Sequence, residues 1–151
     1  MSALSQQYVG YANGASCSTQ NLSFATWAIY APNGELVSLQ WICIGHLTNN
    51  IVEYNAVIKI FSDVITHGIC HIVVRIDSQL VVLHLTNVYL VRSPTMLHMF
   101  LRVRLLERHF DYIQYQYIPR SLNKLIDSLE NHVLDKICDI CKLKLNSHCI
   151  H

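Results

Sequence analysis

The amino-acid sequence predicts an α/β fold in which helices flank a mixed sheet of five strands. Three observations lead to this prediction. Residues 8–44 contain apolar runs separated by turn residues, as successive strands do. From residue 48 the apolar residues recur at helical spacing. Two later β-type runs are each separated from the strand before by a helical stretch, which is typical of strands that join a sheet in parallel.

The opening stretch predicts an antiparallel meander. Strands are expected at residues 8–13, 24–31 and 35–44, and Asn33-Gly34 is a strong hairpin signal between the second and third. We expect the first strand to stop at Asn13 and a loop to begin there. A polar residue at such a boundary is a candidate site residue.

The rest of the chain predicts helices and two more strands. A helix over 48–68 is indicated by spaced apolar residues, with Asn50 and Glu53 as a loose capping box and Gly68 at its end. A strand at 70–77, helices at 78–87 and 93–110, a strand at 111–119 and a final helix at 122–140 follow. The apolar stripe of that last helix consists of Leu122, Ile126, Leu129, Val133, Ile137 and Ile140.

Composition favours one domain over residues 1–151, with a core at about 8–140 and a tail at 141–151. Charged residues make up 14% of the chain, against roughly 25% in a typical soluble domain. Either a protein partner covers part of the apolar surface, or the sequence has drifted from a better-solvated ancestor. No apolar run is long enough to cross a membrane and no secretory signal is visible. We therefore expect an intracellular protein of the cytoplasm or nucleus with free thiols.

Charge is unevenly distributed along the chain. Residues 1–74 carry one basic residue and three acids, whereas residues 75–151 carry ten basic residues and seven acids. The second half could face phosphates or could simply be a solvated helix surface. Its basic residues include Arg92, Arg102, Arg104, Arg108, Arg120 and Lys124.

Three carboxylates stand at positions where a site is expected. Asp77 ends a buried strand just before a helix, Glu53 lies on the inward stripe of the first long helix, and Asp127 lies on the last helix. Each has an alternative role: Asp77 could cap the helix that starts at Ser78, Glu53 could serve only in a cap, and Asp127 could be solvated. Taken together they favour a shared site, because buried charges need a partner or a metal.

Four stretches resemble the ribonuclease H family in its plant reverse-transcriptase-like branch, as found in gypsy-type retrotransposon polyproteins. They are NGAS (13–16), TNNIVEYNAVI (48–58), DSQLVV (77–82) and IPRSLNKLIDSL (118–129). The resemblance implies hydrolysis of the RNA strand of RNA/DNA hybrids with two Mg²⁺ (or Mn²⁺) ions. The implied ligands are Asn13, Glu53, Asp77 and Asp127. The implied nucleic-acid contacts are Gly14, Ala15, Ser16, Asn49, Asn50, Ser78, Gln79, Arg120 and Asn123.

Asn13 departs from that pattern, which has aspartate at this position. An amide offers one neutral oxygen and no charge, and a loss of about 4 kcal/mol would slow a reaction roughly a thousandfold. The substitution is either natural decay of a retroelement copy or an engineered change; low charge and lost glycines in the following turn favour decay. Whether the chain is an enzyme stays open. The alternative is a catalytically inactive module of the same fold that binds a protein or nucleic acid.

A second candidate metal site lies in the tail, where Cys138 and Cys141 precede His148 and His151. The spacing resembles a zinc pattern, although its six-residue spacer is short. The two cysteines also fall at helical spacing, where they could be apolar surface residues.

Overall fold

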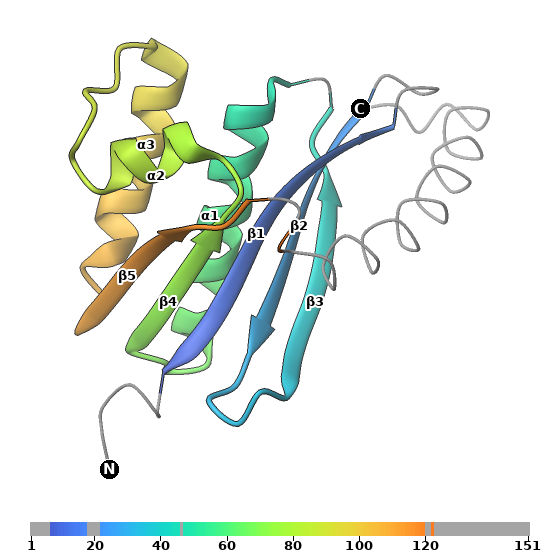
Figure 1. The fold of residues 1–151 in the computed structure, drawn as a ribbon, viewed down its shortest axis with the longest axis vertical. Helices are drawn as coiled ribbons and strands as arrows, with labels where there is room; N and C mark the ends of the chain where they lie inside the picture. Colours follow the sequence, from blue (N-terminus) through green and yellow to red (C-terminus); the bar gives the residue numbers. More distant parts are fainter. Residues whose placement is uncertain (1–6, 18–21, 46, 120–121, 123–151) are drawn as a thin grey trace.

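The computed structural model describes residues 7–17, 22–45, 47–119 and 122, which form one mixed sheet with three helices on one face (Figure 1). The strands are β1 (Tyr8–Cys17), β2 (Leu22–Tyr30), β3 (Leu36–Cys43), β4 (His71–Ile76) and β5 (Tyr112–Tyr117). The helices are α1 (Asn49–Thr66), α2 (Gln79–Leu85) and α3 (Pro94–Glu107). This architecture confirms the predicted α/β class and the order of its elements up to β5.

The first three strands form the predicted antiparallel meander. The hairpin between β2 and β3 turns at Asn33 and Gly34: the Asn33 side-chain oxygen accepts a 3.0 Å hydrogen bond from the Glu35 amide, and Gly34 has a φ of 88°. Glycine adopts that left-handed conformation without the steric cost that a side chain would bring. β2 lies inside the sheet, and its residues 23–29 are buried.

The first strand is longer than predicted. We expected it to stop at Asn13, but β1 continues to Cys17 because residues 13–17 pair antiparallel with β2, from Asn13 opposite Thr26 to Cys17 opposite Leu22. Pairing with a buried neighbour satisfies the backbone groups of this polar stretch, so its composition does not end the strand. The parallel ladder with β4, in contrast, stops one residue before Asn13.

The later strands join the sheet in parallel, as predicted. The strand order is β3-β2-β1-β4-β5, so β1 has β2 on one side and β4 on the other. In the β1–β4 ladder Tyr8 pairs with Ile72 and Ala12 with Ile76. β5 pairs in parallel with β4, from His71 opposite Tyr112 to Ile76 opposite Tyr117. The carboxyl ends of β1 and β4 therefore meet at one end of the sheet.

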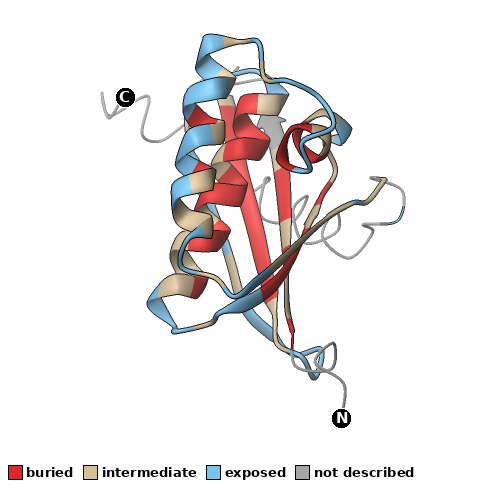
Figure 2. Cartoon of the chain, turned by 90° about the vertical axis from the view of Figure 1, so that its left-hand side faces the viewer, coloured by how far each residue is buried: buried red, intermediate tan, exposed pale blue. Residues whose placement is uncertain are grey.

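The core lies between the sheet and α1, which has the predicted apolar stripe (Figure 2). Tyr54, Val57 and Phe61 of α1 are fully buried. Burying a side chain of this size contributes about 1.5–3 kcal/mol, so α1 fixes the sheet firmly beneath it. The helix ends where predicted, with Gly68 at a φ of 72° and its amide bonded to the Ile65 carbonyl.

Both shorter helices begin at serine caps. Ser93 accepts a hydrogen bond from the Met96 amide, which confirms the predicted cap before Pro94. Ser78 caps α2 in the same way. The predicted helix at 122–140 lies outside the described residues, apart from Leu122. No helix in the described part of the chain combines the length and apolarity needed to span a bilayer. Cys43 and Cys70 are free thiols.

Candidate active site at the carboxyl ends of β1 and β4

Asn13 and Asp77 each directly follow the last pair of the parallel ladder between β1 and β4. Ala12 pairs with Ile76, so the next residue on each strand is Asn13 and Asp77 respectively. Paired residues of neighbouring strands share a face, and the following residue of each projects from the other face. Asn13 is fully buried and Asp77 is half-buried. Two segments 64 residues apart in the sequence are thus placed together by the ladder.

Glu53 reaches the same end of the sheet from α1. Its side chain is buried, with 4% of its surface exposed, and its Oε1 accepts a 2.8 Å hydrogen bond from the Gly14 backbone amide. A hydrogen bond to a carboxylate is stronger than one between neutral groups. This bond ties α1 to β1 directly beside Asn13. The structure therefore brings together Asn13, Glu53 and Asp77, while Asp127 lies outside the described residues.

Gly14 makes this approach of helix and strand possible. A Cβ at this position would stand 3.0 Å from Val52 Cγ1 and 3.4 Å from Glu53 Oε1. The contact with Val52 is tighter than nine in ten real Cβ contacts, so a side chain here would require Val52 on α1 to shift by a few tenths of an ångström. The glycine next to Asn13 therefore serves the packing that lets Glu53 reach the strand.

The alternative cap roles do not describe Glu53 and Asp77. The residue before α1 is Thr48, which makes no side-chain cap bond, and no acid lies in the first turn. The loose capping box predicted from Asn50 and Glu53 is therefore wrong, because the carboxylate of Glu53 turns toward Gly14. The cap of α2 is Ser78 itself, whose Oγ accepts from the Val81 amide, and not Asp77.

Two predicted nucleic-acid contacts are joined across the site. The Ser78 hydroxyl donates a 2.8 Å hydrogen bond to Asn50 Oδ1, which links the start of α2 to the first turn of α1. Asn49 and Gln79 are exposed on either side of this pair. Gly14, Ala15 and Ser16 follow Asn13 along β1. Arg120 and Asn123 lie outside the described residues.

The chemistry of this cluster suits a hard divalent cation. Carboxylate and amide oxygens are the ligands that Mg²⁺ takes in proteins. Among the described residues, however, only Glu53 and Asp77 bring negative charge, and no group of three histidine, cysteine or acidic residues gathers there as a metal site. Asn13 stands at the position that the resemblance assigns to a metal ligand, and it adds no charge there. The tail with Cys138, Cys141, His148 and His151 falls outside the part that the structure describes.

The sequence did not predict a pocket that lies next to the Asn50–Ser78 pair. It has a volume of about 500 Å³ and lies where α1 and α3 begin. Amide groups at helix N-termini favour anions, and the dipoles of both helices act in the same direction. Its lining residues are Leu47, Thr48, Asn50, Ile51, Ser93, Thr95 and Met96. Each helix start is visible in the sequence, but their meeting depends on how α3 packs across α1.

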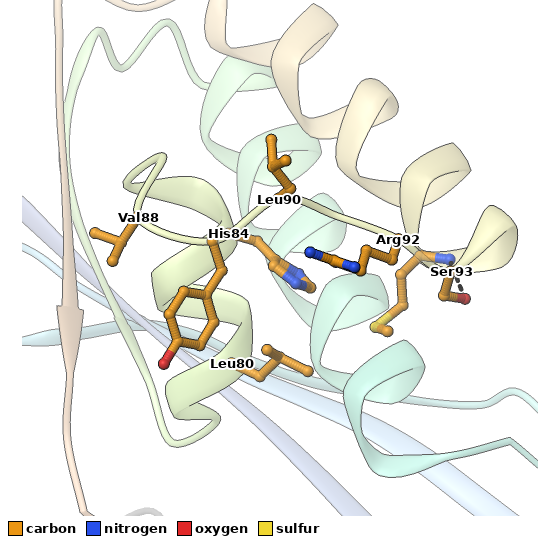
Figure 3. Close-up of a pocket in the computed structure, with 8 residues that line it drawn as sticks. Leu80, His84, Val88, Leu90, Arg92 and Ser93 are labelled. Carbon is orange, nitrogen blue, oxygen red and sulfur yellow. Dashed lines mark hydrogen bonds between the residues drawn. The ribbon is translucent and has the colours of Figure 1, made fainter.

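A neighbouring pocket of about 560 Å³ lies between α2 and the start of α3, with His84 in its wall (Figure 3). His84 is buried, and its Nδ1 is 2.8 Å from the hydroxyl of the buried Tyr54. Burial lowers the pKa of His84 and raises that of Tyr54. The two side chains therefore share this hydrogen bond in their neutral forms, and the tautomer of the His84 ring sets which of them donates. Arg92 points into the same pocket.

Arg104, one of the basic residues of the second half that the structure describes, is committed to contacts within the protein. Its Nη1 binds Glu107 at 2.7 Å, and its Nη2 donates to the Leu85 carbonyl and to Asn87 Oδ1. Arg92, Arg102 and Arg108 are exposed. Of these three, Arg92 lines the pocket between α2 and the start of α3.

Comparisons with known proteins agree with this geometry. The model of the reverse transcriptase-like family matches residues 12–133. A bifunctional protein of Mycobacterium tuberculosis is 33% identical over 92 residues, 61% of this chain and 25% of that protein. This chain thus spans about a quarter of the length of the mycobacterial relatives it matches.

Two solved structures of ribonucleases match this chain over nearly their whole length. The crystal structure of ribonuclease H1 from Halobacterium salinarum is 31% identical, with a TM-score of 0.77 over 86% of this chain and 98% of that chain. LC11-RNase H1, solved in complex with an RNA/DNA hybrid, is 26% identical, with a TM-score of 0.77 over 87% of this chain and 99% of that chain. The chain belongs to the reverse transcriptase-like family and has the ribonuclease H-like fold.

Proposed function

We propose that this chain binds RNA/DNA hybrids at the end of the sheet where β1 and β4 meet, and that Asn13 holds its hydrolysis of the RNA strand far below that of an intact site. The observation that carries the proposal is the placement of Glu53: its buried carboxylate is fixed to the backbone beside Asn13, at the point where Asp77 ends the neighbouring strand. The solved complex of LC11-RNase H1 with a hybrid supports the choice of ligand.

Binding of the hybrid rests on groups that the chain itself provides. The pocket at the starts of α1 and α3 offers backbone amides and the hydroxyls of Thr48, Ser93 and Thr95 to a backbone phosphate. The Ser78–Asn50 hydrogen bond fixes the polar edge between this pocket and the acids. A phosphate held there would set the register of the hybrid, so that its RNA strand passes over Asn13 and Asp77.

Glu53, Asp77 and Asp127, the three acids that the resemblance assigns as ligands, would hold divalent ions together with the Asn13 oxygen. Such ions, when bound, would activate the attacking water and stabilise the leaving oxygen. Three carboxylates supply a charge of −3, and aspartate at position 13 would make it −4. Glu53 is oriented by the Gly14 amide, and Gly14 keeps α1 close enough for that contact. The weak point of the site is thus the charge at position 13, not the shape around it.

The decisive change is Asn13→Asp. Restoring an acid worth about 4 kcal/mol of transition-state stabilisation should raise the rate of hybrid cleavage roughly a thousandfold in Mg²⁺. The assay follows a labelled RNA strand in a hybrid, with the DNA duplex of the same sequence as substrate control. Asn13→Ala is the matched control variant and should remain as slow as the parent chain.

A binding measurement separates metal affinity from catalysis. Mg²⁺ should raise the melting temperature of Asn13→Asp more than that of the parent chain, because a ligand that binds only the folded state stabilises it. If the aspartate variant is folded, gains no stabilisation from Mg²⁺ and stays silent, the site is not a nuclease site and the proposal fails.

The second candidate function is a catalytically silent module of the same fold, which the neutral Asn13 and the exposed apolar side chains of α3 favour. Hybrid binding distinguishes the two. If the chain binds the phosphates of the hybrid, its affinity should fall by about tenfold or more when the salt concentration rises from 50 to 200 mM. Absent or salt-insensitive binding would point to a protein ligand instead.

A further inference from the structure

The outer side of α3 has an exposed row of leucines. Leu97, Leu101 and Leu105 follow one another at four-residue spacing and expose 40%, 52% and 60% of their surface. The opposite side of the same helix packs Met99 and Val103 into the core. A helix at the surface of a globular protein normally has charged or polar residues on its outer side. We call Leu97, Leu101 and Leu105 the leucine ridge.

The leucine ridge continues into an apolar hollow at the amino-terminal half of α3. A pocket of about 200 Å³ there is lined by Leu97 and Phe100 of α3 and by Tyr89 and Leu90 of the preceding loop. Leu90 is 82% exposed, the most exposed of the large apolar side chains in the described residues. The hollow is large enough to receive one apolar side chain, in the way that a groove accepts an anchor residue of a helix.

The charged side chains beside the leucine ridge are basic. Arg102 lies on the flank of the helix next to the ridge, and Arg108 follows its last leucine; both are exposed. The one acid on α3, Glu107, is already bound to Arg104 and accepts a hydrogen bond from the Tyr115 hydroxyl. A surface of this kind is apolar along its centre and basic at its edge.

We infer that the leucine ridge is a docking surface for an amphipathic helix of a partner protein, whose apolar stripe is flanked by aspartate or glutamate. The ridge and hollow match the i, i+4 spacing of such a stripe, and the basic edge matches its acidic flank. A second copy of this chain fits poorly, because a two-fold contact would place Arg102 and Arg108 against the same residues of the partner. The inference does not rest on the proposed function.

The probe is a synthetic, fluorescently labelled helical peptide with leucines on one side and glutamates beside them. A second peptide with lysine at every glutamate is its matched control. We expect the glutamate peptide to bind the full chain at least tenfold more tightly than the lysine peptide, measured by fluorescence anisotropy. Arg102→Glu should reduce that preference by about tenfold, since it reverses the charge at the edge.

The variant Leu101→Ser should weaken binding of the glutamate peptide about tenfold, which is about 1.4 kcal/mol. Leu36→Ser is its control, because Leu36 is a similarly exposed leucine on the edge strand β3 and should leave binding unchanged. Both leucines are at the surface, so both variants should fold.

Three results would overturn the inference. The first is equal binding of the peptide by Leu101→Ser and the parent chain. The second is a dimer in sedimentation experiments that Leu101→Ser dissociates, which would make a second copy the occupant. The third is that neither peptide binds the parent chain. A lower melting temperature of Leu101→Ser would then show that the chain covers the ridge itself.

Discussion

Two polar regions of this protein are built on opposite principles. At the carboxyl ends of β1 and β4, Asn13, Glu53 and Asp77 collect oxygen acceptors at one place. At the corner of α2, α3 and β5, the Arg104 guanidinium meets Glu107, the Leu85 carbonyl and Asn87 Oδ1, and it stacks on the Phe100 ring at 4.4 Å. The first region concentrates one kind of group; the second matches donors with acceptors.

The two regions differ in what their polar groups contribute to the stability of the fold. Matching donors with acceptors stabilises a partly buried corner, because each group recovers the hydrogen bonds it loses to water. A cluster of oxygen acceptors does not stabilise a chain on its own. Such clusters are typical of functional sites, where a ligand such as a cation supplies the positive charge that the cluster lacks. The same fold thus contains a structural corner around Arg104 and an acceptor-rich corner around Asn13.

The largest stability effect should come from the structural corner. Arg104→Met keeps the stem over Phe100 but removes the charge, so Glu107 and the Leu85 carbonyl lose their donor. We expect a loss of about 2 kcal/mol of unfolding free energy, less than for a fully buried pair because both side chains are partly exposed. Urea unfolding measures it. Arg102→Met, at an exposed position of the same helix, should change stability by less than about 0.5 kcal/mol; equal losses would contradict the comparison.

A smaller effect should come from Tyr54, which connects the two regions. It follows Glu53 on α1, and its hydroxyl shares a 2.8 Å hydrogen bond with His84 Nδ1 on α2. Tyr54→Phe removes that hydroxyl from a buried site and should cost about 1 kcal/mol. Tyr112→Phe removes an exposed hydroxyl that donates to Gln114 and should cost much less. The two losses are compared by urea unfolding. If Tyr54→Phe is neutral, the bond between α1 and α2 does not contribute to the fold.

The smallest effect concerns pH. Burial lowers the pKa of His84, so the folded protein keeps this ring neutral while the unfolded chain takes up a proton near pH 6.5. The contribution of His84 to stability is complete above that pH and is lost as the pH falls toward the folded-state pKa.

The measurement is a double difference. Unfolding free energies of the parent chain and of His84→Gln are compared at pH 7.5 and 5.5, so that the other histidines contribute equally to both proteins. We expect the loss on acidification to be smaller in His84→Gln, because glutamine has no proton to gain. A loss as large as in the parent chain would show that His84 does not titrate differently in the two states.

Most of the fold was predictable because its signals are local. The Asn33-Gly34 turn, the apolar stripe of α1, the Ser93 cap and the Gly68 stop are each decided by a few neighbouring residues. The end of β1 was not predictable in this way. Its polar residues 13–17 read as a loop, and only the pairing with β2 makes them a strand.

The sequence predicted which residues gather at the candidate site, but it did not predict the contacts that they make. Asn13, Glu53 and Asp77 stand out by position and by the resemblance to a family. That Glu53 accepts from the Gly14 amide, instead of capping its own helix, depends on the distance between α1 and β1. The pocket where α1 and α3 begin and the Tyr54–His84 bond arise from packing between distant segments, which single-sequence patterns do not report.

The strand order has a consequence for how the protein folds. β1, β2 and β3 are joined by short connections, and this meander can form early at little entropic cost. The β1–β4 ladder closes a much longer loop, with Val9 opposite Val73, and such non-local parallel pairing is slow. Asn13 and Asp77 become neighbours only when that ladder forms. The acceptor-rich corner around them should therefore be the last part of the sheet to assemble on folding and the first to be lost on unfolding.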